Sequence, residues 1–435
     1  MKRFASPLRL AAWTASLALV VLFVLGPMVT LVRGKIADVQ PSAQLAKLGF
    51  KFEGAATCSN AKCHGAAEAA PAPKPPGNEY NVWAEKDRHA LAHEHLGKPD
   101  TQKNPAFAEI GKKMGIADVS TDARCTSCHA LAVPTNLQGQ KFNIKEGITC
   151  NACHGPSEKW NTPHAEIGWT NKQRQAAGSH AALLKQWGLY DTKPVVARAE
   201  KCASCHLAID PTLVAAGHPQ PIFELDYYSE LENKHWRDPE GYFSAKLWAA
   251  GQIVCVRDAM RQLAERASSN APDASVKDAL DQAMGHYAVL KHLLALKAVS
   301  GADAAALDIH AQMLKGAAGN KAAIAPAATA LADAAAKMVD AFNTFEPDKK
   351  VTLSVLQSLS SDASISKEHG LHGVEQQAFA IYSLYNTFAR VEKPADADAT
   401  NDIVAKLFTP LENKTVDAAA YATDLKEVQG KLPKP

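Results

Sequence analysis

The sequence of 435 residues has no basic tract, no glycine-rich phosphate loop and no patch of Lys and Arg interleaved with aromatic residues. These absences exclude the usual signatures of nucleotide and nucleic-acid binding. A strong net charge is also missing, because 47 Lys and Arg are balanced by 45 Asp and Glu. Hydrophobic residues make up 47% of the chain and charged residues 21%, which is typical of a globular protein. We therefore expect a folded chain with no nucleic-acid partner.

Tryptophan and cysteine are unevenly distributed along the chain. No Trp follows Trp248, and eight of the nine cysteines lie between Cys58 and Cys205. Later residues form Ala-rich stretches with helical periodicity, in which Val276 and Leu280 fall on one helix face. The sequence therefore changes character near residue 250.

We predict a mainly α protein in three parts. Residues 1–35 form an N-terminal membrane anchor or signal segment. Residues 36–250 form a Cys-rich domain with short helices and little regular structure. Residues 251–435 form an α-helical bundle of four or more helices.

An uncharged, mainly apolar run extends from Leu10 to Val32, behind Lys2, Arg3 and Arg9. About 20 such residues suffice to cross a bilayer, and the apolar region of a signal peptide is shorter. The preceding positive charges favour a cytoplasmic N-terminus. We predict a single anchor that leaves the remaining chain on the periplasmic side of the cytoplasmic membrane. The alternative is a cleaved signal, which leaves a soluble periplasmic protein.

One pattern of five residues occurs three times in the Cys-rich domain. Its copies are Cys125, Cys128 and His129; Cys150, Cys153 and His154; and Cys202, Cys205 and His206. Cys-x-x-Cys-His is the attachment signature of c-type haem, in which the thiols bind the porphyrin and the histidine ligates the iron. Zinc is the alternative for the first two cysteine pairs, but it does not explain why a histidine follows every pair. We predict three covalently bound haems, whose attachment requires haem attachment machinery as a partner.

A fourth segment, CSNAKCHG, also ends in Cys-His but has four residues between Cys58 and Cys63. Two extra residues can bulge outward while the sulfurs keep their separation. We therefore predict a fourth haem on Cys58, Cys63 and His64, which makes residues 36–250 a multihaem, specifically tetrahaem, cytochrome c domain. The alternative, a disulfide or free thiols at this position, leaves three haems.

Methionine is almost excluded as the sixth iron ligand, because Met114 is the only methionine between residues 34 and 259. Histidine is plentiful outside the motifs, at His89, His93, His95, His164, His180, His218 and His235. Two axial imidazoles leave no open position on the iron, which favours electron transfer at modest to low potential.

The chain resembles the tetrahaem cytochrome c-554 family over roughly residues 55–240. The resemblance rests on the four motifs, on VWAEKDRHALA after the first motif and on CHGPSEKWNTPH at the third. The resemblance implies that His164 is the second ligand opposite His64, and that His89 stands opposite His154. The C-x4-C-H spacing, the membrane anchor and the helical second half depart from the family.

For the haem of His206 the resemblance leaves two candidates, His218 and His235, of which we prefer His218. It also implies a five-coordinate iron at His129, an open site for a small ligand. The spare histidines His93 and His95 argue against that open position.

The sequence thus predicts a membrane-anchored periplasmic tetrahaem cytochrome that relays electrons between respiratory partner proteins. The alternative is a redox enzyme that acts on nitric oxide, hydroxylamine or nitrite at one five-coordinate haem. A third hypothesis assigns the helical half to docking on a larger respiratory complex. Electron transfer is favoured, because no open iron or polar distal pocket is evident from the sequence.

Overall fold

The computed structural model describes residues 41–72, 74–97, 106–207, 209–232 and 236–434. The described residues belong to one compact unit. The predicted anchor in residues 1–35 lies outside them, and so does His235.

The described residues are mainly helical, as predicted, and contain no β-strand beyond an isolated parallel bridge between Phe52 and Gln138. Up to residue 232 the helices are short, and the longest has 12 residues. The α-helices of this part are α2 (Pro41–Ala46), α3 (Glu79–Lys86), α4 (Ala92–Gly97), α5 (Ala106–Lys113), α6 (Ala123–His129), α7 (Cys150–His154), α8 (Trp169–Ala177), α9 (His180–Trp187), α10 (Val195–His206), α11 (Pro211–Ala216) and α12 (Leu225–Leu231). The 3-10 helices are η2 (Ala55–Thr57), η3 (Arg88–Leu91), η4 (Thr135–Leu137), η5 (Ile144–Glu146) and η6 (Pro163–Ala165).

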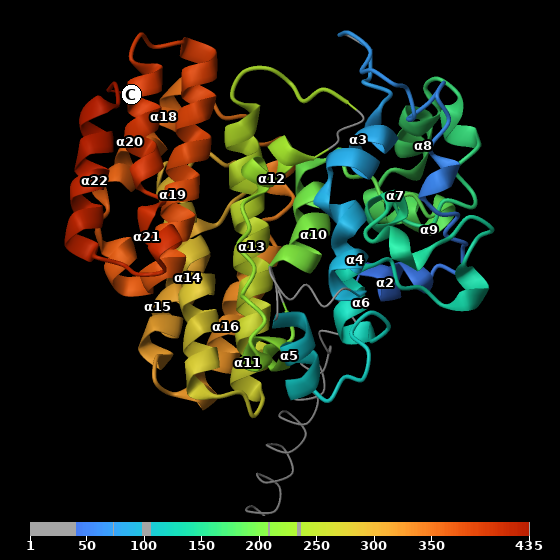
Figure 1. Ribbon diagram of the computed structural model, residues 1–435. Helices are drawn as coiled ribbons and strands as arrows, with labels where there is room; N and C mark the ends of the chain where they lie inside the picture. Colours follow the sequence, from blue (N-terminus) through green and yellow to red (C-terminus); the bar gives the residue numbers. More distant parts are fainter. Residues whose placement is uncertain (1–40, 73, 98–105, 208, 233–235, 435) are drawn as a thin grey trace, which may run out of the picture. The chain divides into compact units, whose positions relative to one another are not determined.

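Longer helices form the second part, which Figure 1 draws from yellow-green to red. They are α13 (Phe243–Ser268), α14 (Asp273–Ala295), α15 (Ala304–Ala317), α16 (Lys321–Ala336), α17 (Ala341–Thr344), α18 (Lys349–Ser361), α19 (Ser364–Glu392), α20 (Ala397–Lys406), α21 (Thr409–Asn413) and α22 (Ala418–Lys431). The predicted helical bundle is therefore present.

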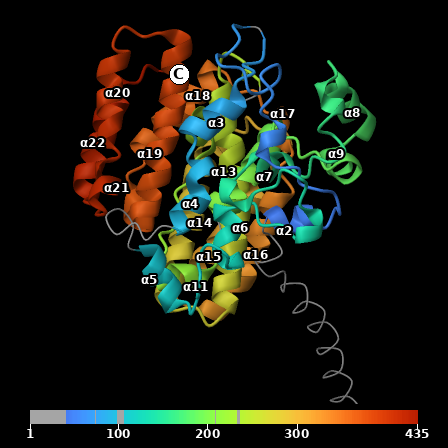
Figure 2. The same ribbon diagram turned by 45° about the vertical axis from the view of Figure 1, so that its right-hand side comes forward.

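The helix α13 joins the two parts. It packs against α10 and α12 on one side and against α14, α16 and α19 on the other, and both views place it centrally (Figures 1 and 2). One hydrophobic core runs from Val195 of α10 through Ile253 of α13 to the C-terminal helices. Because α13 begins at Phe243, residue 250 lies inside this helix and not at its end. The fourth cysteine motif, on α10, is thus built onto the bundle.

Apolar packing is much thinner in the remainder of the first part. Its largest separate cluster has five buried residues, among them Phe52 and Leu131, and a second gathers Trp160, Trp169 and two leucines. Small clusters of this kind suit a domain in which bound haems supply much of the apolar core.

Within the described part of the chain, the segment Lys321–Thr344 is long and apolar enough to cross a membrane, with a mean hydropathy of 1.3. Half of its most apolar window is buried inside the protein, where α16 packs against α13 and α15. Length and composition are weak grounds for a membrane span, because a core helix of a bundle has the same properties. The packing of α16 accounts for its apolar character.

Candidate haem-binding sites

Three of the four motifs lie in the last turns of helices. The helices α6, α7 and α10 end at His129, His154 and His206, respectively. Residues three apart share a helix face, so both cysteines of each motif point to the same side. This local geometry suits attachment of one haem by two thiols.

The first motif is a loop instead of a helix. Residues 59–62 are exposed, and the amides of Cys63 and Gly65 donate to the Asn60 carbonyl at 2.8 and 3.0 Å. A Cβ atom on Gly65 would lie 2.0 Å from the Ser59 carbonyl oxygen, so the tight loop requires glycine there. The extra residues bulge outward, as the attachment hypothesis requires. Both Cys58 and Cys63 are free thiols, and the alternative disulfide is not formed.

The four motifs converge in space. The thiol of Cys58 interacts with that of Cys150, which lowers the pKa of Cys58 to about 6 and raises that of Cys150. The thiols of Cys128 and Cys205 interact in the same way. Cys153 in turn lies close enough to Cys205 for their charges to interact. The first motif therefore lies next to the third. The fourth motif lies next to both the third and the second.

This arrangement does not support the zinc alternative. A zinc site would bring Cys125 and Cys128 together with Cys150 and Cys153, but Cys128 contacts the fourth motif instead. Among the described residues, one group of three ligand atoms converges at metal-site distances, and it contains no cysteine.

Three facing pairs of histidine rings lie close together, one with parallel ring planes and two with the planes edge-on. The ring centroids are 6.0 Å apart for His64 and His164, 5.9 Å for His89 and His206, and 6.3 Å for His129 and His218. Two imidazoles on opposite sides of one iron, with bonds of about 2 Å, have their centroids about 6 Å apart. The pairs therefore fit a haem iron between each two rings.

One expected pair is present, since His164 stands opposite His64 with the ring planes 5° apart. The expectation for His89 needs correction, because its ring faces His206 and not His154. The backbone of His89 does lie next to the third motif, where its carbonyl accepts from the Ile148 amide at 2.9 Å. The direction of the ring, which sequence does not specify, decides the pair.

The expectation for His218 needs the same correction, because it faces His129 and not His206. The short helix α11, which precedes His218, packs against α5, and Phe107 of α5 packs edge-on against the His129 ring at 5.7 Å. The packing of α5 and α11 thus brings His218 to the second motif. His218 is therefore a candidate second ligand at His129, where the resemblance implies an open iron.

Other histidines have different surroundings. His154 packs edge-on against Trp160, with centroids 6.5 Å apart. Nε2 of His93 lies 3.0 Å from the Ser120 carbonyl oxygen, and Nε2 of His180 accepts from the Asp191 amide. His93 and His180 are therefore engaged with the protein itself.

Four of the facing rings have Nδ1 in a hydrogen bond. For His64, Nδ1 lies 3.0 Å from Glu79 Oε2. For His89, Nδ1 lies 3.1 Å from Asp87 Oδ1 and 3.3 Å from Glu232 Oε1. Nδ1 of His164 bonds to the Trp160 and Asn161 carbonyls, and Nδ1 of His218 to the Pro219 carbonyl at 2.8 Å. An Nδ1–H that donates to such an acceptor fixes the tautomer in which Nε2 is available to a metal. The donor set of the structure therefore fits axial ligation of haem iron.

Sequence reasoning did not single out Glu79, Asp87 or Glu232. The position of Asp87, two residues before His89, is a local signal that could have found it. Glu232 has no such signal, because it follows α12 and reaches His89 only through the tertiary fold.

Burial lowers the pKa of His129 and of His206 to about 4. Both rings are therefore neutral at physiological pH, whereas a metal that binds His64 or His89 must displace a proton from the ring. The hydrogen bond that His64 donates to the Glu79 carboxylate raises the pKa of His64. Burial opposes charge on His89, but Asp87 and Glu232 together raise its pKa to about 9.

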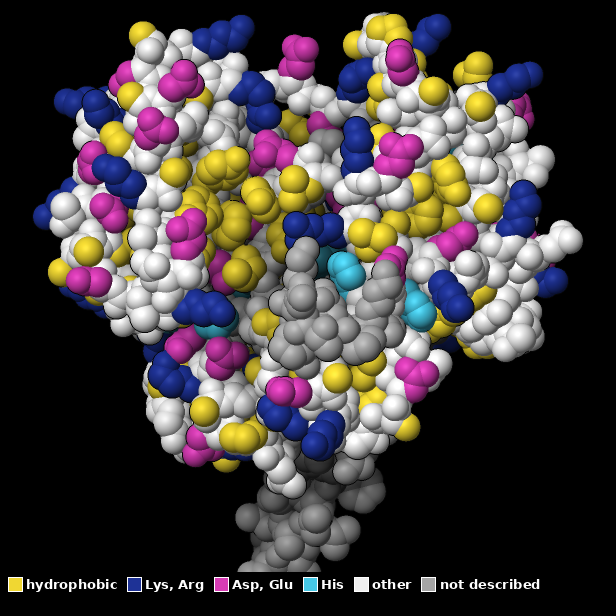
Figure 3. Space-filling model, in the orientation of Figure 1, with side chains coloured by type: hydrophobic (Ala, Val, Ile, Leu, Met, Phe, Trp, Pro, Cys, Tyr) yellow, Lys and Arg dark blue, Asp and Glu magenta, His cyan; other side chains and the backbone are white. Residues whose placement is uncertain are grey.

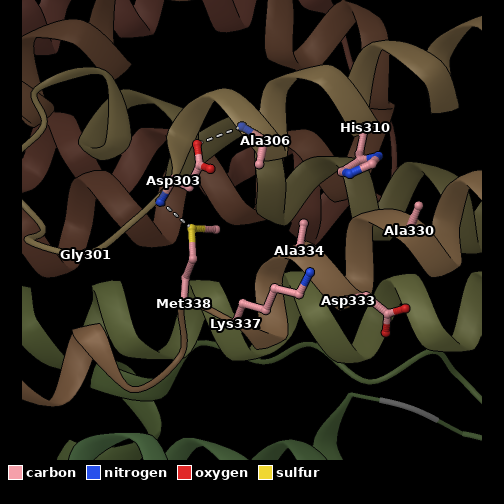
Figure 4. Close-up of a pocket in the computed structure, with 9 residues that line it drawn as sticks. All are labelled: Gly301, Asp303, Ala306, His310, Ala330, Asp333, Ala334, Lys337 and Met338. Atoms are coloured by element: carbon pink, nitrogen blue, oxygen red, sulfur yellow. Dashed lines mark hydrogen bonds between the residues drawn. The ribbon is translucent and has the colours of Figure 1, made fainter.

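The bundle also contains a cavity of about 390 Å³, lined by residues of α15 and α16 and the turns beside them (Figure 4). The Asp303 amide donates to Met338 Sδ at 2.9 Å, and the Asp303 carboxylate accepts from the Ala306 amide at 3.0 Å. These groups stabilise the start of α15. The cavity belongs to the bundle and contains none of the facing histidine pairs.

A mainly helical chain with converging haem-attachment motifs and facing histidine pairs has the features of the multihaem c-type cytochromes. Residues 57–155 match the family model described as cytochrome c554 and c-prime, so the chain contains a domain of this family. Neither a curated protein nor a solved structure matches the chain. The family implies c-type haems and electron transfer. The match covers less than a quarter of the chain and ends before His164, the fourth motif and His218.

Proposed function

We propose that this chain is a tetrahaem cytochrome that relays electrons on the periplasmic side of the cytoplasmic membrane. Its donor would be a membrane quinol dehydrogenase, and its acceptors would be soluble redox proteins. A c-type haem at each motif would supply an iron that cycles between the ferric and ferrous states and carries one electron. The attaching residues would be Cys58, Cys63, Cys125, Cys128, Cys150, Cys153, Cys202 and Cys205, with His64, His129, His154 and His206 as proximal ligands.

The observation that carries this proposal is the set of three histidine pairs at the spacing of a ligated iron. His164, His89 and His218 supply the second imidazole of each pair. Two imidazoles on one iron leave no position for a substrate, which favours electron transfer over catalysis.

The contacts between motifs support a relay. They form an uninterrupted series from the first motif through the third and fourth to the second, by way of Cys150, Cys153, Cys205 and Cys128. Short separations of this kind are what electron tunnelling requires, because its rate falls steeply with distance. Histidine and hydrophobic side chains also reach the surface near the middle of one face (Figure 3), where a redox partner has access to them.

The test is the electron paramagnetic resonance (EPR) spectrum of the oxidised protein, quantified per haem, with a chemical haem count on the same sample. Four haems per chain are expected, with low-spin signals from at least the three paired sites at His64, His129 and His206. A high-spin signal equal to one haem in four would favour the alternative function, a redox enzyme for a small nitrogen compound at an open iron. Fewer than three haems would contradict the proposal.

The fourth haem has its own test in the double variant Cys58→Ser and Cys63→Ser. The haem count should fall from four to three, while a Cys255→Ser control, at a buried thiol of α13, should keep four. An unaltered count in the double variant would leave the C-x4-C-H segment without a haem.

The proposed membrane anchor in residues 1–35 is tested by extraction. The full chain should stay with the membrane fraction in high salt and leave it only with detergent. Release by salt alone would contradict the anchor and leave the soluble periplasmic form.

A further inference from the structure

His89 differs from the other facing histidines in the charge of its hydrogen-bond acceptors. Its Nδ1 lies 3.1 Å from Asp87 Oδ1 and 3.3 Å from Glu232 Oε1. Asp87 is the N-cap of η3 and accepts from the His89 amide as well, at 2.9 Å. Glu232 arrives from the end of α12, on a distant part of the chain. Two carboxylates thus converge on one imidazole.

The other two pairs carry less negative charge at their rings. Among the described residues, the His64 ring pairs with the Glu79 carboxylate, and its opposite ring, that of His164, bonds to backbone carbonyls. In the described part of the chain, the His218 ring bonds to the Pro219 carbonyl and the His129 ring to the backbone of Ala92, which are both neutral partners.

This difference acts on the stability of ferric iron. Loss of an electron adds one positive charge to the iron, and a nearby carboxylate stabilises that charge by Coulomb attraction. A carboxylate that accepts the Nδ1–H also makes the imidazole a stronger donor to the metal. Both effects lower the reduction potential. Asp87 is only 13% exposed, so water screens its charge weakly.

We propose that Asp87 and Glu232 are positioning residues that give the His89–His206 site the lowest reduction potential of the three paired sites. Transfer from this site to the His129–His218 site is then downhill. The two sites are neighbours, because Cys205 and Cys128 interact. With haem held at both motifs, one electron would pass from a ferrous iron on His206 and His89 to a ferric iron on His129 and His218. The Nδ1 protons stay on their rings, so no proton or co-reactant is consumed. The inference rests on the proposed function, since it needs haem at both motifs.

The test uses Glu232→Gln in the full holoprotein, because glutamine keeps the shape of the side chain and removes its charge. Haem content and the EPR spectrum are measured first, and the four potentials then come from a spectroelectrochemical titration. EPR spectra of samples taken at fixed potentials during the titration identify the site whose potential moves. One wave should shift to more positive potential, with haem content and low-spin signals unchanged. Asp87→Asn should shift the same wave, and Glu232→Asp should restore most of the original potential.

The matched control is Glu230→Gln, two residues earlier on α12, which pairs with Arg390 instead of a histidine. It should leave all four waves in place. Four unchanged potentials in Glu232→Gln, with haem content intact, would overturn the inference while the proposed function stands. Failure of the proposed function would appear earlier, as missing low-spin haem in the unaltered protein.

Two further outcomes would also overturn the inference. Loss of one haem in Glu232→Gln would mean that the carboxylate holds the fold and does not set the potential. Asp87, His89 and Glu232 also lie close enough together to hold a divalent cation. One bound non-iron metal ion per chain in the purified protein, absent from Glu232→Gln, would assign the group to that cation.

Discussion

At the scale of single residues, the function depends on which histidine stands opposite which. Local sequence gives each motif its proximal histidine, since this residue directly follows the second cysteine. The opposite ring comes from elsewhere in the chain, at His164, His89 and His218. Substitution of one such ring should therefore open one iron and leave the others unaltered.

His218→Ala should open the iron at His129, because it removes the ring 6.3 Å away. We expect a high-spin EPR signal of about one haem in four. The control, His93→Ala, should keep a low-spin spectrum, since His93 bonds to the Ser120 carbonyl.

The same variant tests the correction made by the structure. Adding Cys125→Ser and Cys128→Ser removes the second haem, so the high-spin signal should disappear. A signal that persists would mean that His218 serves another motif, such as that of His206.

At the scale of elements, the long helices contain two features that helical periodicity does not predict. One is a kink in α19, where Gly370 has φ 54° and ψ −135°. The other is the buried polar stretch that follows the kink, with Glu375, Gln376 and Gln377 each at most 5% exposed. The polar stretch is buried where α19 packs against other helices such as α14 and α18, whereas Gly370 is half-buried.

Gly370→Ala should lower the free energy of unfolding by about 1–2 kcal/mol, because a side chain disfavours positive φ. An added Cβ atom would meet nothing within 4 Å, so the cost is conformational and not steric. The control is Gly316→Ala in α15, which also has open space and should be neutral or stabilising by up to about 1 kcal/mol. Urea denaturation followed by circular dichroism measures both. Equal effects would contradict the conformational account.

Burial raises the pKa of Glu375 to about 7, against a partly compensating charge on His372. Because the folded pKa lies above the ordinary value, the folded state holds this proton more tightly than the unfolded state. Its contribution to stability is complete below the ordinary carboxyl pKa and is lost as pH rises through about 7. The wild-type protein should therefore lose stability between pH 5 and pH 8 by an amount on the order of 1–3 kcal/mol from this group.

Glu375→Gln should flatten that pH dependence, and urea denaturation at the two pH values measures the difference. Burial also raises the pKa of Glu224 to about 7, so part of the pH dependence of stability should remain in the variant. The exposed Glu412→Gln serves as the control and should behave as wild type. If Glu375→Gln loses as much stability between pH 5 and pH 8 as the wild-type protein, the assignment to Glu375 is wrong.

At the scale of the whole molecule, the bundle and the haem region share one hydrophobic core. Val195 and Val196 of α10 belong to the same core as Ile253 of α13 and Leu425 of α22. The helical half therefore supports the fourth motif directly. This contact gives the helical half a structural role beside the docking role considered from the sequence.

A chain that ends at residue 250 should lose the haem of the fourth motif, because α10 then lacks most of the helix against which it packs. The haem count should fall by at least one, and the EPR signal of the His89–His206 site should be missing. A milder variant, Ile253→Ala, should lower the free energy of unfolding by about 2–5 kcal/mol, as this side chain is fully buried. Unchanged haem spectra in the shortened chain would favour a separate docking domain.

The sequence by itself determined what depends on neighbouring residues. Cys-x-x-Cys-His places its thiols and histidine within one turn of chain, so the attachment chemistry and the proximal ligands can be read locally. Ala-rich periodicity likewise predicted the mainly α fold and the bundle. The anchor prediction lies outside the described residues and stays a prediction.

Only the tertiary structure decided which histidines face one another and which carboxylates reach them. His89 and His206 meet because η3 and the end of α10 converge, and Glu232 joins them from α12. Ring direction and long-range packing set these contacts, and one sequence contains no local signal for either. The motifs therefore suffice to predict a number of haems, whereas the pairing of the histidines depends on how distant segments pack.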